Sequence, residues 1–162
     1  ADIAPALIIL GAKAVMEGLQ GWETVPVENL FTAAGENGEE YAILTEVRIP
    51  KQTASEIGLV YEKSGGIGAA VLLKLDAKHV NVEDFRVVVG GTGPVPVEAQ
   101  EAATIMVGNP IDDYLVMDAA EAAANAVCDK LDLDLVEKTR DVIDEAIRHA
   151  LDRAIGDFAL GY

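Results

Sequence analysis

Three largely apolar segments in the middle of the chain are typical of β-strands, and in the second of them Ala69, Val71 and Leu73 alternate with their neighbours. The three segments are residues 57–63, 68–75 and 80–89, the last of them bent near Glu83. A period of two residues places successive side chains on opposite faces of a strand. The short turn at 76–78 is typical of a hairpin, in which neighbouring strands run antiparallel. The pattern therefore predicts a three-stranded antiparallel sheet.

The last third of the chain changes to the three- and four-residue spacing of amphipathic helices. Pro96 and Gly108 stand where a first helix is expected to begin and end. A second helix is predicted over 113–127, and Asp134 with Glu137 resembles a capping box at the start of a third. We therefore expect an α+β fold in which a layer of three helices covers one face of the sheet.

The first fifty residues alternate shorter elements. Residues 5–16 read as a buried helix that leads into a strand, and 25–31 as an extended piece followed by a turn of helix. A surface loop is expected at 33–40, where glycines stand among acids. Residues 41–50 then read as a strand that ends at a proline.

Charge excludes two classes of partner. The 162 residues include 28 acids and 12 bases, for a net charge of −16. Such a surface repels phosphate backbones and anionic lipid, so we expect no nucleic acid and no membrane partner. Nothing reads as a signal peptide, and the apolar run near the N-terminus is too short to cross a bilayer. The expected location is cytoplasmic.

Cysteine and histidine are too sparse to indicate a metal site by their spacing. The single cysteine, Cys128, stands in an alanine-rich helical stretch and is expected to be a small buried residue. His79 and His149 are seventy residues apart, which is not a metal-ligand spacing.

The glycine-rich stretch at 90–93 raises the possibility of a phosphate-binding loop, because it follows a β-branched run and precedes a helical stretch. A dinucleotide fingerprint would need a further glycine where Pro96 stands, and a P-loop would need a lysine that this stretch lacks. Prolines at 94 and 96 also remove N–H donors. We interpret the stretch as a structural turn.

Five segments in order give the chain a resemblance to a known family. They are ADIAPALIILGA at 1–12, VPVENLF at 25–31, ILTEVRIP at 43–50, YEK at 61–63 and RVVVGGTGPVPVEAQEA at 86–102. Together they resemble the FAD-binding (medium) subunits of molybdenum hydroxylases, the xanthine dehydrogenase and carbon monoxide dehydrogenase family. The resemblance extends over roughly residues 1 to 110 and corresponds to the C-terminal half of such a subunit.

The resemblance implies a division into two parts. Residues 1–52 would be the second part of an FAD-binding α/β subdomain, and residues 53–162 a CO dehydrogenase flavoprotein-like C-terminal domain. Two glycine-rich loops that hold the FAD diphosphate in the family have no counterpart here, nor does the family's Arg-Gly-Ser-x-x-Tyr-Arg segment. We therefore expect FAD to be shared with an N-terminal half that this chain does not contain.

The resemblance also implies cofactor-binding residues, each with a structural alternative. Asp2 matches an aspartate that contacts the flavin cofactor, but it also suits a helix cap. Leu44 matches a residue beside the isoalloxazine ring and could equally be plain core. Lys63 matches a lysine near that ring and could equally be a solvated strand-end lysine. Trp22, by contrast, is expected to be a hydrophobic plug rather than a flavin contact.

The leading functional hypothesis is an electron-transfer component. In the family, the flavoprotein takes electrons from the 2Fe-2S small subunit, which receives them from a molybdopterin-binding large subunit, and passes them from FAD to an acceptor. The competing hypothesis is a non-catalytic assembly or docking module that has lost flavin binding. A small-molecule sensor that uses a crevice between sheet and helices is a third, weaker alternative.

Overall fold

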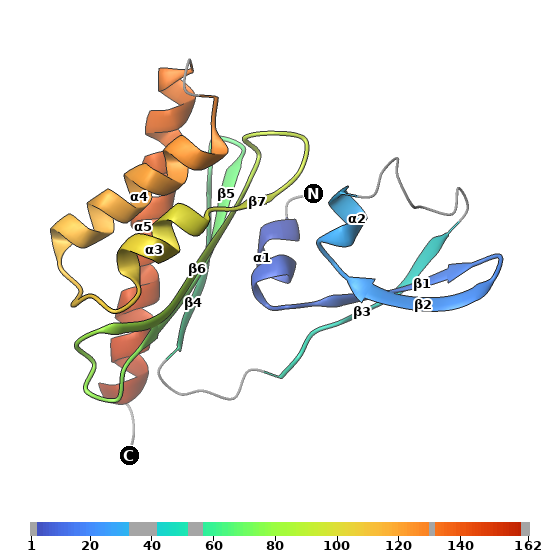
Figure 1. The fold of residues 1–162 in the computed structure, drawn as a ribbon, viewed down its shortest axis with the longest axis horizontal. Coiled ribbons are helices and arrows are strands. Elements are labelled where there is room, and N and C mark those ends of the chain that lie inside the picture. Colours follow the sequence, from blue (N-terminus) through green and yellow to red (C-terminus); the bar gives the residue numbers. More distant parts are fainter. Residues whose placement is uncertain (1–2, 33–41, 52–56, 130–131, 160–162) are drawn as a thin grey trace.

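The computed structural model describes residues 3–32, 42–51, 57–129 and 132–159. The chain forms two antiparallel sheets, and helices cover one face of the larger sheet (Figure 1). This arrangement confirms the predicted α+β class. The predicted loop at 33–40 and the proposed domain boundary at 52 fall outside the described residues.

The smaller sheet is built from the first fifty residues and has the strand order β2-β1-β3. Both pairings are antiparallel, so β1 lies between two neighbours. The strands are β1 (Lys13–Gly18), β2 (Gly21–Pro26) and β3 (Ile43–Arg48). The strand expected over 41–50 is confirmed within the described range, and the helical turn expected after 25–27 is α2 (Asn29–Thr32).

The larger sheet has the order β4-β5-β6-β7, and each neighbouring pair is antiparallel. Its strands are β4 (Ile57–Ser64), β5 (Ile67–Leu75), β6 (Val82–Gly90) and β7 (Val97–Glu98). The three predicted strands are therefore confirmed with nearly the predicted bounds. The expected bend near Glu83 is a register irregularity, at which Lys74 pairs with Asp84 but Leu75 pairs with Val82.

The short strand β7 corrects the predicted start of the first helix. Val97 and Glu98 pair with β6, and α3 (Gln100–Met106) begins four residues after Pro96. The Glu98 carboxylate accepts two hydrogen bonds from the Arg86 guanidinium, at 2.8 and 2.9 Å. This ion pair and the ladder bonds hold 97–98 in an extended conformation. Gly108 follows α3 with φ of +84°, the left-handed conformation expected there.

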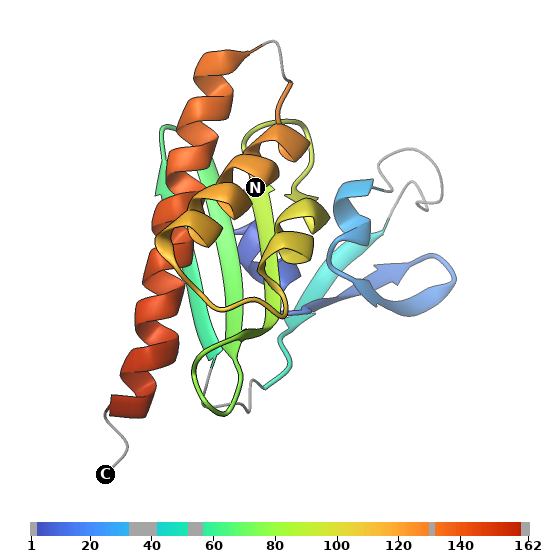
Figure 2. The same cartoon turned by 60° about the vertical axis from the view of Figure 1, so that its left-hand side comes forward.

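Three helices cover one face of the larger sheet, as predicted (Figure 2). They are α3, α4 (Asp113–Val127) and α5 (Leu133–Ala159). The helix α5 begins one residue before the predicted capping box, because Asp132 accepts the hydrogen bond from the Leu135 N–H at 3.0 Å. No helix in the described part of the chain is long and apolar enough to cross a membrane.

The main core lies between this helical layer and the sheet. Buried alanines of α4 allow close packing against α3 and α5. Cys128 is buried as predicted, and its thiol bonds the Thr139 hydroxyl at 3.3 Å. The largest fully buried side chains of this core come from β5, β6, α3 and α5, namely Leu73, Leu75, Phe85, Met106, Ile143 and Ile147.

A second, smaller core lies on the opposite face of the larger sheet. There α1 (Ala4–Ile9) packs on β5 and β6, with Ile8 and Ile9 against Leu72 and Val88. Helix α1 thus shares a core with the larger sheet. The smaller sheet lies on the same side as α1, away from α3, α4 and α5 (Figure 1).

Candidate functional site

The three cofactor-binding residues implied by the family resemblance lie in different parts of the chain and of the fold. Asp2 lies outside the described residues, so its proposed contact stays a prediction. Leu44 lies on β3 of the smaller sheet, and Lys63 lies near the end of β4 of the larger sheet. The two residues therefore belong to different sheets.

Leu44 is a surface residue rather than the core residue that its apolar strand suggests. It is 46% exposed and pairs with Met16 of β1, while Val47, paired with Ala14, is 37% exposed. Positions 44 and 47 share a face because the ladder shifts register between Val15 and Met16. Leu44 and Val47 therefore form an exposed apolar strip along β3, which we call the β3 strip.

The opposite face of the same sheet also exposes large apolar side chains. Trp22 and Ile43 are both paired with Glu17, so the three share that face. Trp22 is 67% exposed and Ile43 is 68% exposed. The expectation that Trp22 is a hydrophobic plug is therefore wrong, because most of this residue is exposed.

Strand alternation places Lys63 on the α1 side of the larger sheet. Val60 belongs to the core under α5, whereas Leu59 and Tyr61 pack against the core under α1. Side chains two residues apart share a face, so Lys63 points to the same side as Tyr61. Lys63 is an exposed residue on the side of the larger sheet where the smaller sheet lies.

Gly68 makes room for the aromatic ring beside Lys63. It pairs with Lys63 in the ladder, and a Cβ built on it would collide with the hydroxyl and ring carbons of Tyr61. The Tyr61 ring therefore lies over β5, next to Lys63. A cation beside an aromatic surface suits a flat ring that gains negative charge.

The glycines at 90 and 91 are explained by packing. Gly91 has φ of +91°, and a Cβ on it would collide with the carbonyl oxygen of Gly66. Gly90 lies against Pro5 of α1, where a Cβ would come within 2.9 Å of the proline ring. These contacts give the stretch a structural role that needs no bound phosphate.

Sequence reasoning missed how many large apolar side chains the smaller sheet exposes. Leu44 and Val47 are exposed on one face and Trp22 and Ile43 on the other, and Ile49 is exposed just beyond the strand. A signal was present, because the ILTEV segment carries apolar residues on both faces of one strand. A strand of an ordinary two-layer fold buries only one of its faces.

Comparison with known proteins finds a family match for the segment that holds β5, β6 and β7 of the larger sheet and helices α3 and α4. Residues 66–133 match the family described as the CO dehydrogenase flavoprotein C-terminal domain. No curated protein matches the chain.

Solved structures share the fold over nearly the whole chain. Carbon monoxide dehydrogenase from Hydrogenophaga pseudoflava is 24% identical with a TM-score of 0.77, and covers 93% of this chain and 56% of its own. Quinoline 2-oxidoreductase from Pseudomonas putida 86 is 18% identical with a TM-score of 0.79, and covers 96% and 57%. Reconstituted CO dehydrogenase from Oligotropha carboxidovorans is 22% identical with a TM-score of 0.70, and covers 94% and 56%.

These findings confirm the resemblance drawn from the sequence. The matched family is a flavoprotein C-terminal domain, and the solved structures share the fold. The chain spans little more than half the length of the solved chains it matches.

Proposed function

We propose that this chain is part of the FAD-binding electron-transfer subunit of a molybdenum hydroxylase, an oxidoreductase component of the cytoplasm. The observation that carries the proposal is the family match over 66–133, in a chain whose fold aligns over 93–96% of its length with hydroxylase chains. In this role the chain passes electrons from iron–sulfur clusters through FAD to an acceptor.

The exposed residues of the chain fit part of a flavin site. The β3 strip offers an apolar surface for a flat ring, and Lys63 offers a cation on the side of the larger sheet that faces the smaller sheet. When bound, FAD supplies the redox chemistry. We assign Asp2, Leu44 and Lys63 as the residues of this chain that would contact it.

Each assigned residue has a distinct physical task. Leu44 would exclude water from one side of the ring, which strengthens any electrostatic contact made there. Lys63 would stabilise the negative charge that builds on the ring as it is reduced. Asp2 would hold a polar part of the cofactor by accepting a hydrogen bond.

Three contacts cannot hold so large and flexible a ligand by themselves, because fixing it costs more entropy than they offset. We therefore propose that an N-terminal FAD-binding half, in the same or another polypeptide, supplies the diphosphate and adenosine contacts. The further partners would be a molybdopterin-binding large subunit and a 2Fe-2S small subunit. A hydroxylase chain matched here is almost twice as long as the aligned segment, which leaves room for such a half.

A docking module without flavin is the second candidate. The observation that favours it is the packing role of Gly90 and Gly91, which means that this glycine-rich turn is not free to hold phosphate. Co-expression with the N-terminal half distinguishes the two. A yellow complex with flavin absorbance supports the electron-transfer role, whereas a colourless complex that takes up no added FAD supports the docking module.

A further inference from the structure

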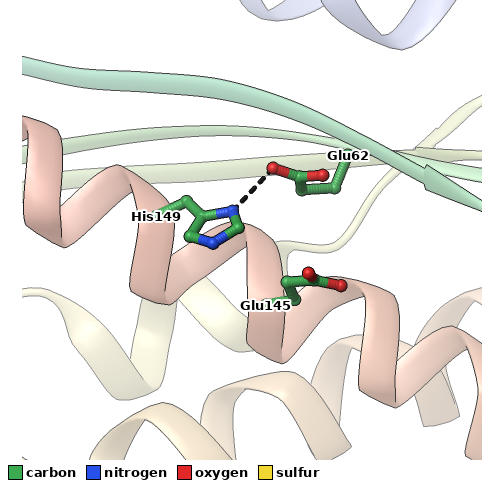
Figure 3. Close-up of side chains that lie close together, drawn as sticks. All are labelled: Glu62, Glu145 and His149. Atoms are coloured by element: carbon green, nitrogen blue, oxygen red, sulfur yellow. Dashed lines mark hydrogen bonds and ion pairs between the residues drawn. The ribbon is translucent and has the colours of Figure 1, made fainter.

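Three metal-ligating side chains meet on the helical side of the larger sheet, away from Lys63. They are Glu62 of β4 and two residues of α5, Glu145 and His149 (Figure 3). The Nδ1 atom of His149 lies 2.7 Å from a carboxylate oxygen of Glu62. One donor atom from each residue lies within 4.8 Å of the other two.

The backbone holds these three positions in place. Residues four apart on a helix share a face, so Glu145 and His149 both point toward β4. The helix crosses the strand so closely that a Cβ on Gly58 would collide with the carbonyl oxygen of Ala150. Only glycine allows this approach, and the cluster lies beside it.

A second contact fixes the same crossing. The Arg153 guanidinium, one turn beyond His149, donates a hydrogen bond to the Leu59 carbonyl oxygen at 2.8 Å. Arg153 is thereby held at the Leu59 end of the crossing, and Glu62 stands three residues further along β4. The cluster is therefore bordered by Arg153 and by two closely packed elements.

The donor set selects a class of ion. One imidazole nitrogen and two carboxylate oxygens suit a borderline divalent transition metal such as Zn²⁺, whereas Mg²⁺ and Ca²⁺ prefer oxygen ligands alone. Ligands of four-coordinate zinc lie about 3.3 Å from one another. To reach that spacing, the Glu62 and His149 donor atoms, now 2.7 Å apart, would separate slightly and the exposed Glu145 side chain would turn toward them.

The local charge also favours a cation. Besides the two carboxylate ligands, Asp152 stands three residues after His149 on the same helix and adds a further negative charge. A divalent ion would neutralise the two carboxylate ligands.

We propose that Glu62, Glu145 and His149 form a binding site for a divalent transition metal ion of the Zn²⁺ class, with water in the remaining coordination position. Such an ion would fasten α5 to β4. The site lies on the face of the sheet opposite to Lys63, so it is independent of the proposed flavin site.

The test uses the 162-residue chain with Co²⁺ as a spectroscopic probe and Zn²⁺ as competitor, in millimolar Mg²⁺ to occupy the acidic surface. We expect saturable 1:1 Co²⁺ binding with visible d–d bands that Zn²⁺ abolishes, and a higher Tm with Zn²⁺. His149→Ala should lose the bands. Glu62→Gln and Glu145→Gln should each weaken Zn²⁺ binding at least about tenfold.

Glu101→Gln is the matched control, because it removes one exposed carboxylate from a helix outside the cluster. It should leave Zn²⁺ affinity unchanged. The proposal is overturned if His149→Ala binds Zn²⁺ as tightly as the wild type, or if binding does not saturate, since either result leaves only an ion pair at this site. Glu145 is exposed, so Glu145→Gln reports on binding without disturbing the fold.

Discussion

At the scale of single residues, the Arg86–Glu98 ion pair links three elements of the fold, namely β6, β7 and α1. The pair joins β6 to β7 and lies partly buried, with 34% and 27% of the two side chains exposed. The Arg86 guanidinium also approaches the Ile9 carbonyl oxygen of α1 at 3.5 Å. One arginine therefore connects the sheet edge to the helix on its back face.

Removing the carboxylate should destabilise the fold in a pH-dependent way. The hydrogen bonds from Arg86 hold the pKa of Glu98 below its ordinary value of 4.5. A lowered pKa in the folded state contributes stability above the ordinary pKa, and this contribution is lost as pH falls through the lower folded value. Glu98→Gln should cost about 1 kcal/mol at pH 7.

Urea unfolding of wild type and Glu98→Gln at pH 7, 4 and 3 measures this effect. The difference between the two proteins should be largest at pH 7 and shrink as pH falls below 4.5. Asp118→Asn, at an exposed position of α4, is the control and should show no such trend. A constant difference at every pH would show that packing, and not charge, holds β7.

Lys63 is the second residue whose task can be measured. In the complete FAD-loaded subunit, Lys63→Met should lower the midpoint potential of the flavin, because a cation near the reduced ring is lost. Lys74→Met is the matched control. Lys74 lies on the same face of the sheet but about 20 Å further along β5 from Gly68, the partner of Lys63. An unchanged or higher potential in the Lys63 variant would refute the assignment.

At the scale of elements, the sequence was sufficient wherever a pattern was local. The period of two residues predicted β4, β5 and β6, and the helical spacing predicted α4 with its observed bounds. The sequence-based prediction failed where a residue distant in the sequence determines the local structure. Residues 97–98 form a strand because Arg86, eleven and twelve residues earlier, holds Glu98 against β6, and that contact has no signature in the segment itself.

The turn after β6 gives a prediction at this scale. Gly91→Ala should lower stability by roughly 1–3 kcal/mol, because it strains a positive φ and places a Cβ against the Gly66 carbonyl. Gly93→Ala is the control, since a Cβ there meets open space. Thermal melting measures both.

The same variants test the phosphate-loop alternative. Gly91→Ala should leave the FAD affinity of the complete subunit unchanged. If flavin binding fell selectively while Tm stayed at the wild-type value, the stretch at 90–93 would have to be reinterpreted as a cofactor loop.

At the scale of the whole molecule, the antiparallel order of β4, β5 and β6 could be predicted from the sequence, but which side chains are exposed could not. Trp22 was expected to be a hydrophobic plug, and core was the alternative for Leu44, but both are exposed because their burial depends on what covers the smaller sheet. The Glu62–His149 contact joins residues 87 apart and becomes visible only when α5 crosses β4. The i,i+4 spacing of Glu145 and His149 was the one local trace of it.

Net charge sets the response of the whole molecule to salt. With 28 acids against 12 bases, repulsion between carboxylates opposes the compact state. Screening should relieve this repulsion, so Tm should rise as KCl increases from 0.05 to 1 M, with most of the gain below about 0.3 M where the screening length shortens fastest. A Tm that falls over this range would show that the ion pairs outweigh the repulsion.

The central claim is that this chain completes a flavin site together with an N-terminal half, with Leu44 at the ring. Quenching of FAD fluorescence measures it directly, in the isolated chain and in the chain joined to that half. We expect little or no binding by residues 1–162 alone and tight binding by the joined protein. Leu44→Asp should weaken that binding at least about tenfold, whereas Ile43→Asp, on the opposite face of β3, should not. Tight binding by the isolated chain, or equal effects of the two substitutions, would contradict the claim.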